Sequence, residues 1–518
     1  MSYESDYRSP IVGDLNLPPE KYAPTDYSGP RDYPDPDVRV ALLIELNVLF
    51  PGGLGAVREA FYRLWRQFVE RAGVPVPPGL VSESATQPPV PAGLSLIAPK
   101  LYQCVLTRRQ LRTLVDDDRA TQPHTIFRAW PDYRLKPQID RSAPTVKADA
   151  AWRSYAAHGR GIVWAVIDSG IDAAHPHFAG LELATHDRDS RTSGLHRDFS
   201  NLVQPEVPLR DGEYPGTDGE PLRDRSGHGT HVAGIISGRA PDKPLVALTR
   251  EPGSEGFVLR EQTGALSGMA PECELVSLKV MRRSEEGTWV TSSAAVIRAL
   301  TYLRTEVNVD PAVLRVHGVN LSLGCEWHPE QYAAGQSPLC QALNQLVSSG
   351  VVAVVSAGNV GARATSGDSA TTAAVLGSIT EPAHAEECVA VGSTHREAPH
   401  AFGVTWTSGK GPTLDGRMKP DVVAPGEWIS SAAAGEVATR AGFDGTEGDP
   451  TYAEQSGTSM AAPHVSGVVA AFLSARPEFV GRPRQVKQLL LDSATDLGRE
   501  RYAQGAGLVD LMRMLSNV

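Results

Sequence analysis

The sequence predicts an α/β protein with a doubly wound, mostly parallel sheet and helices on both faces, preceded by a small α+β domain. After Trp152, short apolar runs alternate with stretches of helical periodicity, which is typical of a parallel sheet covered by helices. Before that point, strand and helix patterns alternate over a much shorter length. We therefore predict a flexible tail at residues 1–36, the α+β domain at 37–137, a linker at 138–151 and the α/β domain at 152–518.

The α+β domain is predicted from changes in periodicity. Val38–Leu46 alternates apolar and other residues as a strand does, and Ala56–Ala72 carries its large apolar residues on one helical face, ended by Gly73. Further strands are expected at Leu101–Leu106 and Thr125–Trp130, a helix at Arg108–Val115, and a proline-rich loop at Val74–Pro99. The result is a β-α-β-α-β series.

The α/β domain shows longer alternation. The expected strands are Gly161–Ile167, Glu274–Val280, Gly318–Leu323, Val351–Ser356 and Cys388–Gly392, and the expected helices are Ser292–Thr305, Leu339–Ser348, Met460–Leu473 and Gln485–Ser493. Two stretches, Arg188–Asp224 and Arg239–Leu266, are interpreted as inserted surface loops.

Net charge, apolar content and cysteine count indicate which partners and which location to expect. The net charge of −11, from 49 basic and 60 acidic residues, argues against a nucleic-acid or an anionic-membrane partner. No membrane span is expected, and the first residues lack the basic and apolar regions of a secretory signal. The five cysteines are odd in number and show no CxxC spacing, so reduced thiols and a cytoplasmic location are expected.

The first chemical motif is GTSMAAPHVSG at Gly457–Gly467. It places the hydroxyl of Ser459 in the first turn of an apolar, buried helix. Free backbone N–H groups and the positive end of the helix dipole would surround that hydroxyl, which suits the stabilisation of an oxyanion. The alternative is a serine that only caps a core helix.

Two further motifs carry an acid and a base. Asp168 stands at the carboxyl end of a buried strand, where α/β sheets place catalytic groups, although a structural turn cap is the alternative. His228 lies between Gly227 and Gly229 at a helix start, with room beside its ring for proton transfer; a cap or surface residue is the alternative. A metal pair with His231 is rejected, because no third ligand has suitable spacing.

A fourth motif, SAGN, ends a second buried strand with Asn359. Its side-chain amide can donate to a developing oxyanion, whereas an asparagine that merely tolerates a left-handed turn is the other interpretation. Asp168, His228 and Ser459 follow one another in the Asp…His…Ser order, which distinguishes one class of serine hydrolase from two others.

Six segments, DSGID, GHGTHVAG, NLSLG, SAGN, KPDVVAPG and GTSMAAPHVSG, occur in this order, and together they resemble the subtilisin-like serine proteases, the subtilase family. The resemblance runs from Trp152 to the end of the chain. It implies a subtilisin-like fold and a serine endopeptidase, with Ser459 as nucleophile, His228 as base, Asp168 as its orienting acid and Asn359 in the oxyanion hole.

The resemblance also implies roles for the rest of the chain. By position and pattern, the α+β domain is similar to the ferredoxin-like propeptide of subtilases, which would place its tail, Tyr133–Ala143, in the cleft as an inhibitor. A structural or partner-binding domain that stays attached is the alternative. A catalytically silent scaffold, and an enzyme locked until the N-terminal domain is released, also remain open as readings of the whole chain.

The resemblance also implies which residues contact the substrate, which would be a peptide or a protein. One edge would be Ser322, Leu323 and Gly324, the opposite edge Gly287, Thr288 and Trp289, and the main pocket Ser356, Ala357 and Gly358 with the residues after Asn359. Val360 brings no acid to this pocket, which favours an uncharged side chain on the acyl side of the cleaved bond. Cys325 is either a redox-sensitive position near the substrate or a small buried thiol.

No cofactor is required by this chemistry and no metal ligand is assigned. Calcium is common in the family, and Asp444–Asp449 is rich in oxygen ligands. Its spacing fits no EF-hand, so an acidic surface turn is the preferred interpretation.

Overall fold

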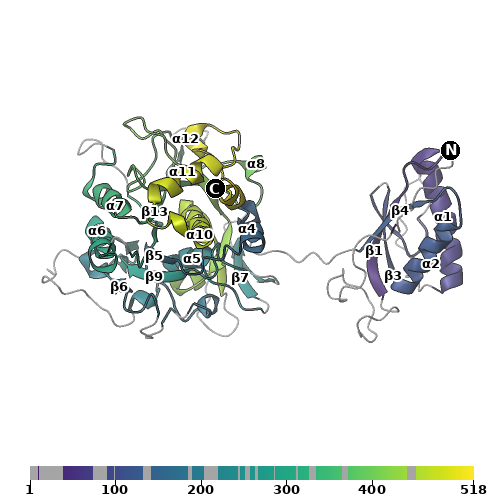
Figure 1. Ribbon diagram of the computed structural model, residues 1–518, viewed down its shortest axis with the longest axis horizontal. Coiled ribbons are helices and arrows are strands. Elements are labelled where there is room, and N and C mark those ends of the chain that lie inside the picture. The colour runs from purple at the N-terminus through teal and green to yellow at the C-terminus, as the bar shows by residue number, and fades with distance from the viewer. Residues whose placement is uncertain are drawn as a thin grey trace. The chain divides into compact units, whose positions relative to one another are not determined.

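The computed structural model describes residues 10, 39–73, 90–98, 100–131, 142–181, 183–184, 190–203, 220–242, 245–250, 257–262, 266–284, 286–310, 313–325, 334–364, 372–439 and 451–518. The chain forms two compact units, Met1–Lys136 and Pro137–Val518 (Figure 1). Each unit has a hydrophobic core of its own.

The N-terminal unit is an antiparallel sheet packed against two helices. Its elements are β1 (Arg39–Leu46), α1 (Gly53–Ala72), β2 (Ser95–Ala98), β3 (Leu101–Thr107), α2 (Arg108–Arg119) and β4 (Ile126–Pro131), with sheet order β2-β3-β1-β4. Alternation in β1 buries Val40, Leu42 and Ile44 against the face of α1 that carries Phe61 and Trp65. The predicted small α+β domain is confirmed.

One expectation in this unit is wrong. Val74–Pro99 was expected to be loop throughout, yet Ser95–Ala98 forms β2 at the edge of the sheet. This strand pairs with β3 on one side only, and the pairing is interrupted by a bulge between Leu96 and Ala98. Such a short edge strand is held by backbone hydrogen bonds, so it leaves little side-chain periodicity in the sequence.

The second unit is built on one large sheet. Its strand order is β17-β16-β13-β12-β5-β9-β6, formed by β5 (Val163–Asp168), β6 (Arg197–Asp198), β9 (Glu274–Lys279), β12 (Gly318–Leu321), β13 (Val352–Ser356), β16 (Val389–His395) and β17 (Val422–Glu427). Each neighbouring pair in this order is parallel. The predicted parallel sheet is therefore confirmed.

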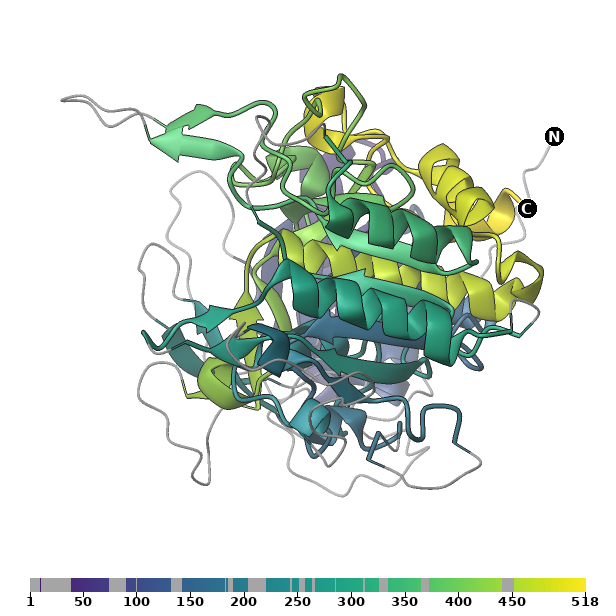
Figure 2. The same ribbon diagram turned by 90° about the vertical axis from the view of Figure 1, so that its left-hand side faces the viewer.

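Helices cover both faces of this sheet. One face carries α4 (Ala148–Tyr155), α5 (His228–Ile236), α10 (Thr458–Ala475), α11 (Pro483–Ser493) and α13 (Leu511–Ser516), and the other carries α6 (Ser293–Tyr302) and α7 (Pro338–Ser348). Figure 2 is viewed from the side of α6 and α7. Successive residues of β5 alternate between the two cores: Trp164 and Val166 pack with α10, whereas Ala165 and Ile167 pack with α6 and α7. This is the doubly wound arrangement that the sequence predicts.

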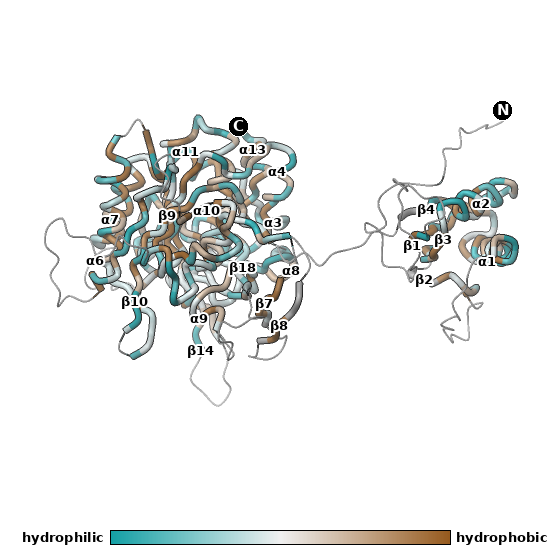
Figure 3. Tube along the Cα trace, turned by 90° about the horizontal axis from the view of Figure 1, so that it is seen from below, coloured by the Kyte–Doolittle hydropathy of each residue, from teal (hydrophilic) through white to brown (hydrophobic). Residues whose placement is uncertain are grey.

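Helix α10 forms the centre of the core on its face of the sheet. It has the length and hydropathy of a membrane span, but most of it is buried inside this unit, against β12, β13, β16 and β17. The hydrophobic colouring in Figure 3 is concentrated in the strands around β9 and beside this helix. Its composition therefore reflects a core position.

Three stretches depart from the expected loops and linker. Arg239–Leu266 contains an antiparallel hairpin of β7 (Leu245–Arg250) and β8 (Phe257–Gln262), which joins β18 (Ile429–Ala432) and β19 (Tyr452–Gln455) in a second sheet. Arg188–Asp224 contributes β6 to the edge of the large sheet. The expected linker 138–151 contains α3 (Ser142–Thr145) and the start of α4, because their alanines pack into the core of this unit.

Shorter elements complete the second unit. They are β10 (Arg282–Arg283), β11 (Trp289–Val290), β14 (Ala362–Ala364), β15 (Thr372–Ala374), α8 (Pro399–Phe402), α9 (Gly435–Ala438), α12 (Arg501–Gln504), a π-helical turn at Leu303–Val307 and single turns of 3₁₀ helix at Pro176–Phe178, Ser200–Val203, Glu220–Leu222 and Pro477–Phe479.

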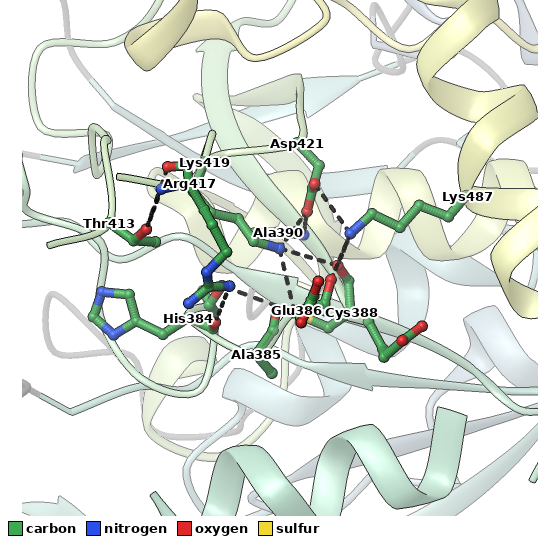
Figure 4. A network of polar contacts seen from close by, with 12 residues as sticks. His384, Ala385, Glu386, Cys388, Ala390, Thr413, Arg417, Lys419, Asp421 and Lys487 are labelled. Carbon is green, nitrogen blue, oxygen red and sulfur yellow. Dashed lines mark hydrogen bonds and ion pairs between the residues drawn. The ribbon is translucent and has the colours of Figure 1, made fainter. Parts of the chain in front are cut away.

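A buried ionic cluster ties α11 to the edge of the large sheet (Figure 4). Asp421, just before β17, receives Lys419 Nζ at 2.6 Å and Lys487 Nζ at 3.1 Å. Both ammonium groups also donate to the carbonyl of Cys388, and the backbone N–H of Ala390 donates to the same carboxylate at 2.7 Å. Burial alone would raise the pKa of Asp421, but the two lysine charges outweigh it, so that pKa is lowered.

Candidate active site

The predicted site residues gather at the carboxyl-terminal edge of the large sheet. Asp168 is the last residue of β5, Ser322 follows β12, and Asn359 follows β13. These strands are neighbours and parallel, so their ends lie at one edge. Such edges are where open α/β sheets bind ligands.

Asp168 and His228 form a buried pair. Asp168 Oδ1 lies 2.8 Å from His228 Nδ1 and accepts a second hydrogen bond, also 2.8 Å, from the backbone N–H of Ser169. The aspartate side chain is fully buried, while the histidine is 23% exposed. An imidazole held through Nδ1 by a buried carboxylate keeps its Nε2 directed away from that carboxylate, where it can exchange a proton.

The glycines beside His228 allow this approach. A Cβ at Gly229 would lie 2.2 Å from the carbonyl oxygen of Gly170 and 3.1 Å from Asp168 Cβ. Any side chain at that position would push the first turn of α5 away from β5. Gly229 is therefore required for the close packing of α5 against the end of β5, and not only for space beside the imidazole ring.

The first turn of α5 is held by a second buried acid, Asp224. Its carboxylate accepts from the backbone N–H groups of Gly227 and Thr230 and from the hydroxyl of Ser169. Ser169 Oγ in turn accepts from the N–H of Gly229 at 2.9 Å. Burial raises the pKa of Asp224, and the hydrogen bonds from Gly227 and Thr230 offset part of that rise. Asp224 thus fixes the turn from which His228 projects.

Ser459 lies in the first turn of α10. Its hydroxyl donates to the backbone carbonyl of Ser322 at 3.1 Å, and the hydroxyl of Ser322 donates to the carbonyl of Ser459 at 2.8 Å. Asn320 in β12 donates to Ser322 Oγ at 2.9 Å and accepts from Ser466 of α10 at 2.8 Å. The start of α10 is therefore locked to the end of β12.

Asn359 is oriented by the residue before the serine. Its Oδ1 accepts from the backbone N–H of Thr458 at 2.8 Å and from the hydroxyl of Thr458 at 3.0 Å. With the oxygen fixed in this way, the Nδ2 group is the donor that remains for a ligand. Gly457 has φ +147°, and a Cβ there would lie 3.2 Å from Asn359 Nδ2, so glycine keeps this donor unobstructed.

Two recesses border these side chains. The serine-side recess, of about 190 Å³, is lined by Leu323, Gly324, Cys325, Ser356, Gly358, Asn359, Val360, Thr380, Thr458 and Ser459. The histidine-side recess, of about 360 Å³, is lined by Ser226, His228, Met281, Trp289, Ser322, Glu436, Val437 and Gln455. Ser322 therefore links the two recesses: it lines the histidine-side recess, and its backbone carbonyl accepts a hydrogen bond from Ser459, which lines the serine-side recess.

Three of the expected substrate-binding residues lie elsewhere. Ala357 is fully buried, and it lines neither recess. Gly287 and Thr288 form the turn between β10 and β11 and also lie outside both linings, whereas Trp289 lines the histidine-side recess. Cys325 is exposed at the serine-side recess, so the alternative of a small buried thiol does not hold.

Potential metal ligands do not gather into a cluster within the described residues. It contains no group of three or more His, Cys, Asp or Glu side chains placed to hold an ion. His231, rejected as a ligand on spacing, is buried in α5 and its Nε2 donates to the carbonyl of Ala453 at 2.9 Å. Asp444–Asp449, considered for calcium, lies outside the described residues.

Comparison with known proteins agrees with this arrangement. The model of the Subtilase family matches residues 159–508, which include Asp168, His228, Asn359 and Ser459. The chain belongs to the subtilase family. Its large parallel sheet with helices on both faces has the subtilisin-like α/β architecture that the motifs predict.

Several curated subtilases are similar to this chain. M-protease from Shouchella clausii (strain KSM-K16) is 29% identical, over 63% of this chain and 66% of the relative. Serine protease AprX from Bacillus subtilis (strain 168) is 28% identical, over 68% and 65%, and Subtilisin Savinase from Lederbergia lenta is 29% identical, over 63% and 93%. The match thus spans just under two thirds of the length of the first two relatives.

Sequence reasoning missed two residues of this subtilase's site. Asp224 was noted only as the end of a loop, although an acid shortly before a helix is a signal for capping. Thr380 lines the serine-side recess but belongs to none of the six motifs. It reaches the site through tertiary contacts, which no local pattern reveals.

Proposed function

We propose that this subtilase is a serine endopeptidase that cleaves peptide or protein substrates through Asp168, His228 and Ser459 and an acyl-enzyme intermediate. The observation that carries the proposal is the buried Asp168–His228 pair, 2.8 Å between Oδ1 and Nδ1, at the same sheet edge as a serine in the first turn of a helix. Membership of the family agrees with it.

Acylation starts with the serine hydroxyl. As Ser459 Oγ attacks the substrate carbonyl, its proton passes to His228 Nε2, and Asp168 stabilises the imidazolium through Nδ1–H. The hydroxyl proton now directed to the Ser322 carbonyl must turn to the imidazole for this step. The tetrahedral oxyanion would be met by Asn359 Nδ2 and the backbone N–H of Ser459, donors that are already oriented before the reaction.

Breakdown of the tetrahedral intermediate returns the proton. His228 gives it to the leaving amine, the peptide C–N bond breaks and the acyl group stays on Ser459. A water then loses its proton to the same imidazole and attacks the ester. The second tetrahedral intermediate collapses to the free acid and restores the serine.

A fluorophosphonate probe and a peptide library test the proposal on the full chain. A recognition sequence for a site-specific protease, inserted between residues 136 and 137, allows the two units to be severed after folding. We expect labelling of Ser459 and peptide cleavage, both absent in Ser459→Ala. If neither appears before or after severing, the chain is a silent scaffold and the proposal is wrong.

We further propose that the N-terminal unit restrains the enzyme by occupying its cleft. Support comes from the order of the chain: a separately packed α+β unit, with its own core, directly precedes the unit that carries the site. A segment already joined to the enzyme competes with substrate at high effective concentration, so even modest contacts would inhibit.

The severable chain tests this restraint directly. We expect the rate of fluorophosphonate labelling to rise after the linker is cut and the N-terminal unit is separated, relative to the uncut chain. Equal rates before and after separation would overturn the restraint while leaving the peptidase intact.

A further inference from the structure

The serine-side recess is closed by a side chain from a third segment of the chain. Its walls are residues 323–325, after β12, and, at and after the end of β13, Ser356 and residues 358–360. Thr380 is joined to both walls: its N–H donates to the Ala357 carbonyl at 3.1 Å, and the next residue, Glu381, pairs through its backbone with Cys325. The threonine therefore spans the floor between the two walls.

Two glycines show how tightly this threonine fits. A Cβ at Gly324 would lie 2.7 Å from Thr380 Oγ1, and a Cβ at Gly358 would lie 2.5 Å from the same atom and 2.6 Å from Thr380 Cγ2. The threonine side chain thus fills the space between the walls where both lack side chains. It is 8% exposed, so it is packed in place.

The described lining of this recess carries no charged side chain. The nearest acid in sequence, Glu381, is 2% exposed and accepts from the thiol of Cys340 in α7 at 3.7 Å, so its carboxylate is engaged away from the recess. A charged substrate side chain in the recess would lose its hydration without gaining a partner, which is costly.

We propose that Thr380 determines specificity by shortening the acyl-side pocket, so that the enzyme cleaves after small uncharged residues such as alanine or serine. The inference rests on the peptidase function proposed above and assigns its substrate class. Ser459 and Asn359 both line this recess, so a substrate residue whose carbonyl meets them would direct its side chain between the two walls. A long side chain would strike Thr380 at the floor.

The size of the effect follows from pocket packing. One methylene more or less in an apolar pocket changes kcat/KM by about 10- to 200-fold. Replacement of Thr380 by glycine removes the three side-chain atoms that fill the floor. We therefore expect the preference for alanine over phenylalanine on the acyl side to fall by at least about tenfold in Thr380→Gly.

The experiment uses the severable full chain and four peptides that differ only in the acyl-side residue, which is Ala, Val, Phe or Lys. Active sites are titrated with the fluorophosphonate, so each kcat/KM refers to folded, labelled enzyme. Thr380→Gly is compared with Thr380→Ser, which keeps the hydroxyl that lies 3.5 Å from the Ala357 carbonyl and loses only the methyl. Thr405→Gly is the matched control, since its hydroxyl also donates to a backbone carbonyl, that of Ser393, outside both recesses.

The expected order for the wild type is Ala above Val, with Phe and Lys lowest. Thr380→Gly should gain Phe cleavage, Thr380→Ser should lie between, and Thr405→Gly should keep the wild-type order. A labelled wild type that cleaves after Phe as readily as after Ala, or a Thr380→Gly with unchanged ratios, overturns the pocket assignment alone. No label and no cleavage in any form overturns the peptidase function itself.

Discussion

Two buried carboxylates of the second unit, Asp168 and Asp421, differ in the partners that surround them. Asp421 receives two ammonium groups, from Lys419 and Lys487, and a backbone N–H. Asp168 receives one backbone N–H and one imidazole, and that imidazole borders a recess. Two lysine ammonium groups surround the first carboxylate, while the second holds an imidazole that borders a recess.

The two settings suit different roles, a structural one for Asp421 and the proposed catalytic one for Asp168. At Asp421 the charge is compensated within the cluster, and its hydrogen bonds join α11 to the sheet. At Asp168 the partner is an imidazole, which the proposed acyl transfer would convert to an imidazolium beside the carboxylate. A buried acid that pairs with an imidazole beside a recess therefore marks a candidate active site better than a buried acid that pairs with lysines.

We expect the greatest loss of activity when the Ser459 hydroxyl, the proposed nucleophile, is removed. Ser459→Ala should lower peptidase activity by on the order of a millionfold, the loss known for subtilisin when its serine or histidine is removed. The hydroxyl borders a recess and donates one hydrogen bond, to the Ser322 carbonyl, among the described residues, so the fold should persist without it. Initial rates with the best library peptide, together with the melting temperature, measure both. Activity above one thousandth of the wild type would exclude Ser459 as the nucleophile.

The next variants exchange the two carboxylates themselves. Asp168→Asn should reduce kcat by about ten-thousandfold, because the amide favours the wrong imidazole tautomer. Asp421→Asn should instead destabilise the fold by about 3–5 kcal/mol, because two buried ammonium groups lose their counter-charge. Denaturant unfolding and kcat per fluorophosphonate-labelled site separate the effects. If Asp421→Asn lost activity per labelled site without losing stability, the comparison would fail.

A smaller effect is expected at the oxyanion donor. Asn359→Ala should lower kcat by about a hundred- to thousandfold with little change in KM, a range measured for the equivalent donor of a subtilisin. The variant also frees the hydroxyl of Thr458, so Thr458→Val serves as the control for lost orientation. A rise in KM with unchanged kcat would place Asn359 in ground-state binding instead.

A still smaller effect is expected when the stability of the Asp421 cluster is followed against pH. The lysine charges lower the pKa of Asp421, so its contribution to stability is complete above the ordinary carboxyl pKa of about 4 and is lost as pH falls through the lowered value. The melting temperatures of the wild type and Asp421→Asn should therefore differ at neutral pH and converge in acid. A constant difference down to the acid limit would contradict this assignment.

The sequence alone was enough to propose those site residues whose role requires one specific side chain. Ser459, His228 and Asp168 stand at the ends of strongly apolar elements, so both their identity and their neighbours leave local signals. The parallel sheet was predictable for the same reason, since its strands are buried on both faces.

The remaining features depend on contacts between distant segments. Thr380 acts through its approach to Gly324 and Gly358, which the pairing of Cys325 with Glu381 brings about. The hairpin of β7 and β8 was taken for a loop because the stretch around it is charged and glycine-rich, although Leu245, Ala247 and Leu248 are buried. Neither feature produces a periodic pattern.

Helix α10 carries Ser459, the proposed nucleophile, at one end, while nearly all of its remaining length packs into the core. The reactive hydroxyl cannot be displaced without disturbing the same helix that holds several strands together. If the proposed peptidase function holds, thermal inactivation should coincide with cooperative melting of the whole second unit, with no partly unfolded form that still works.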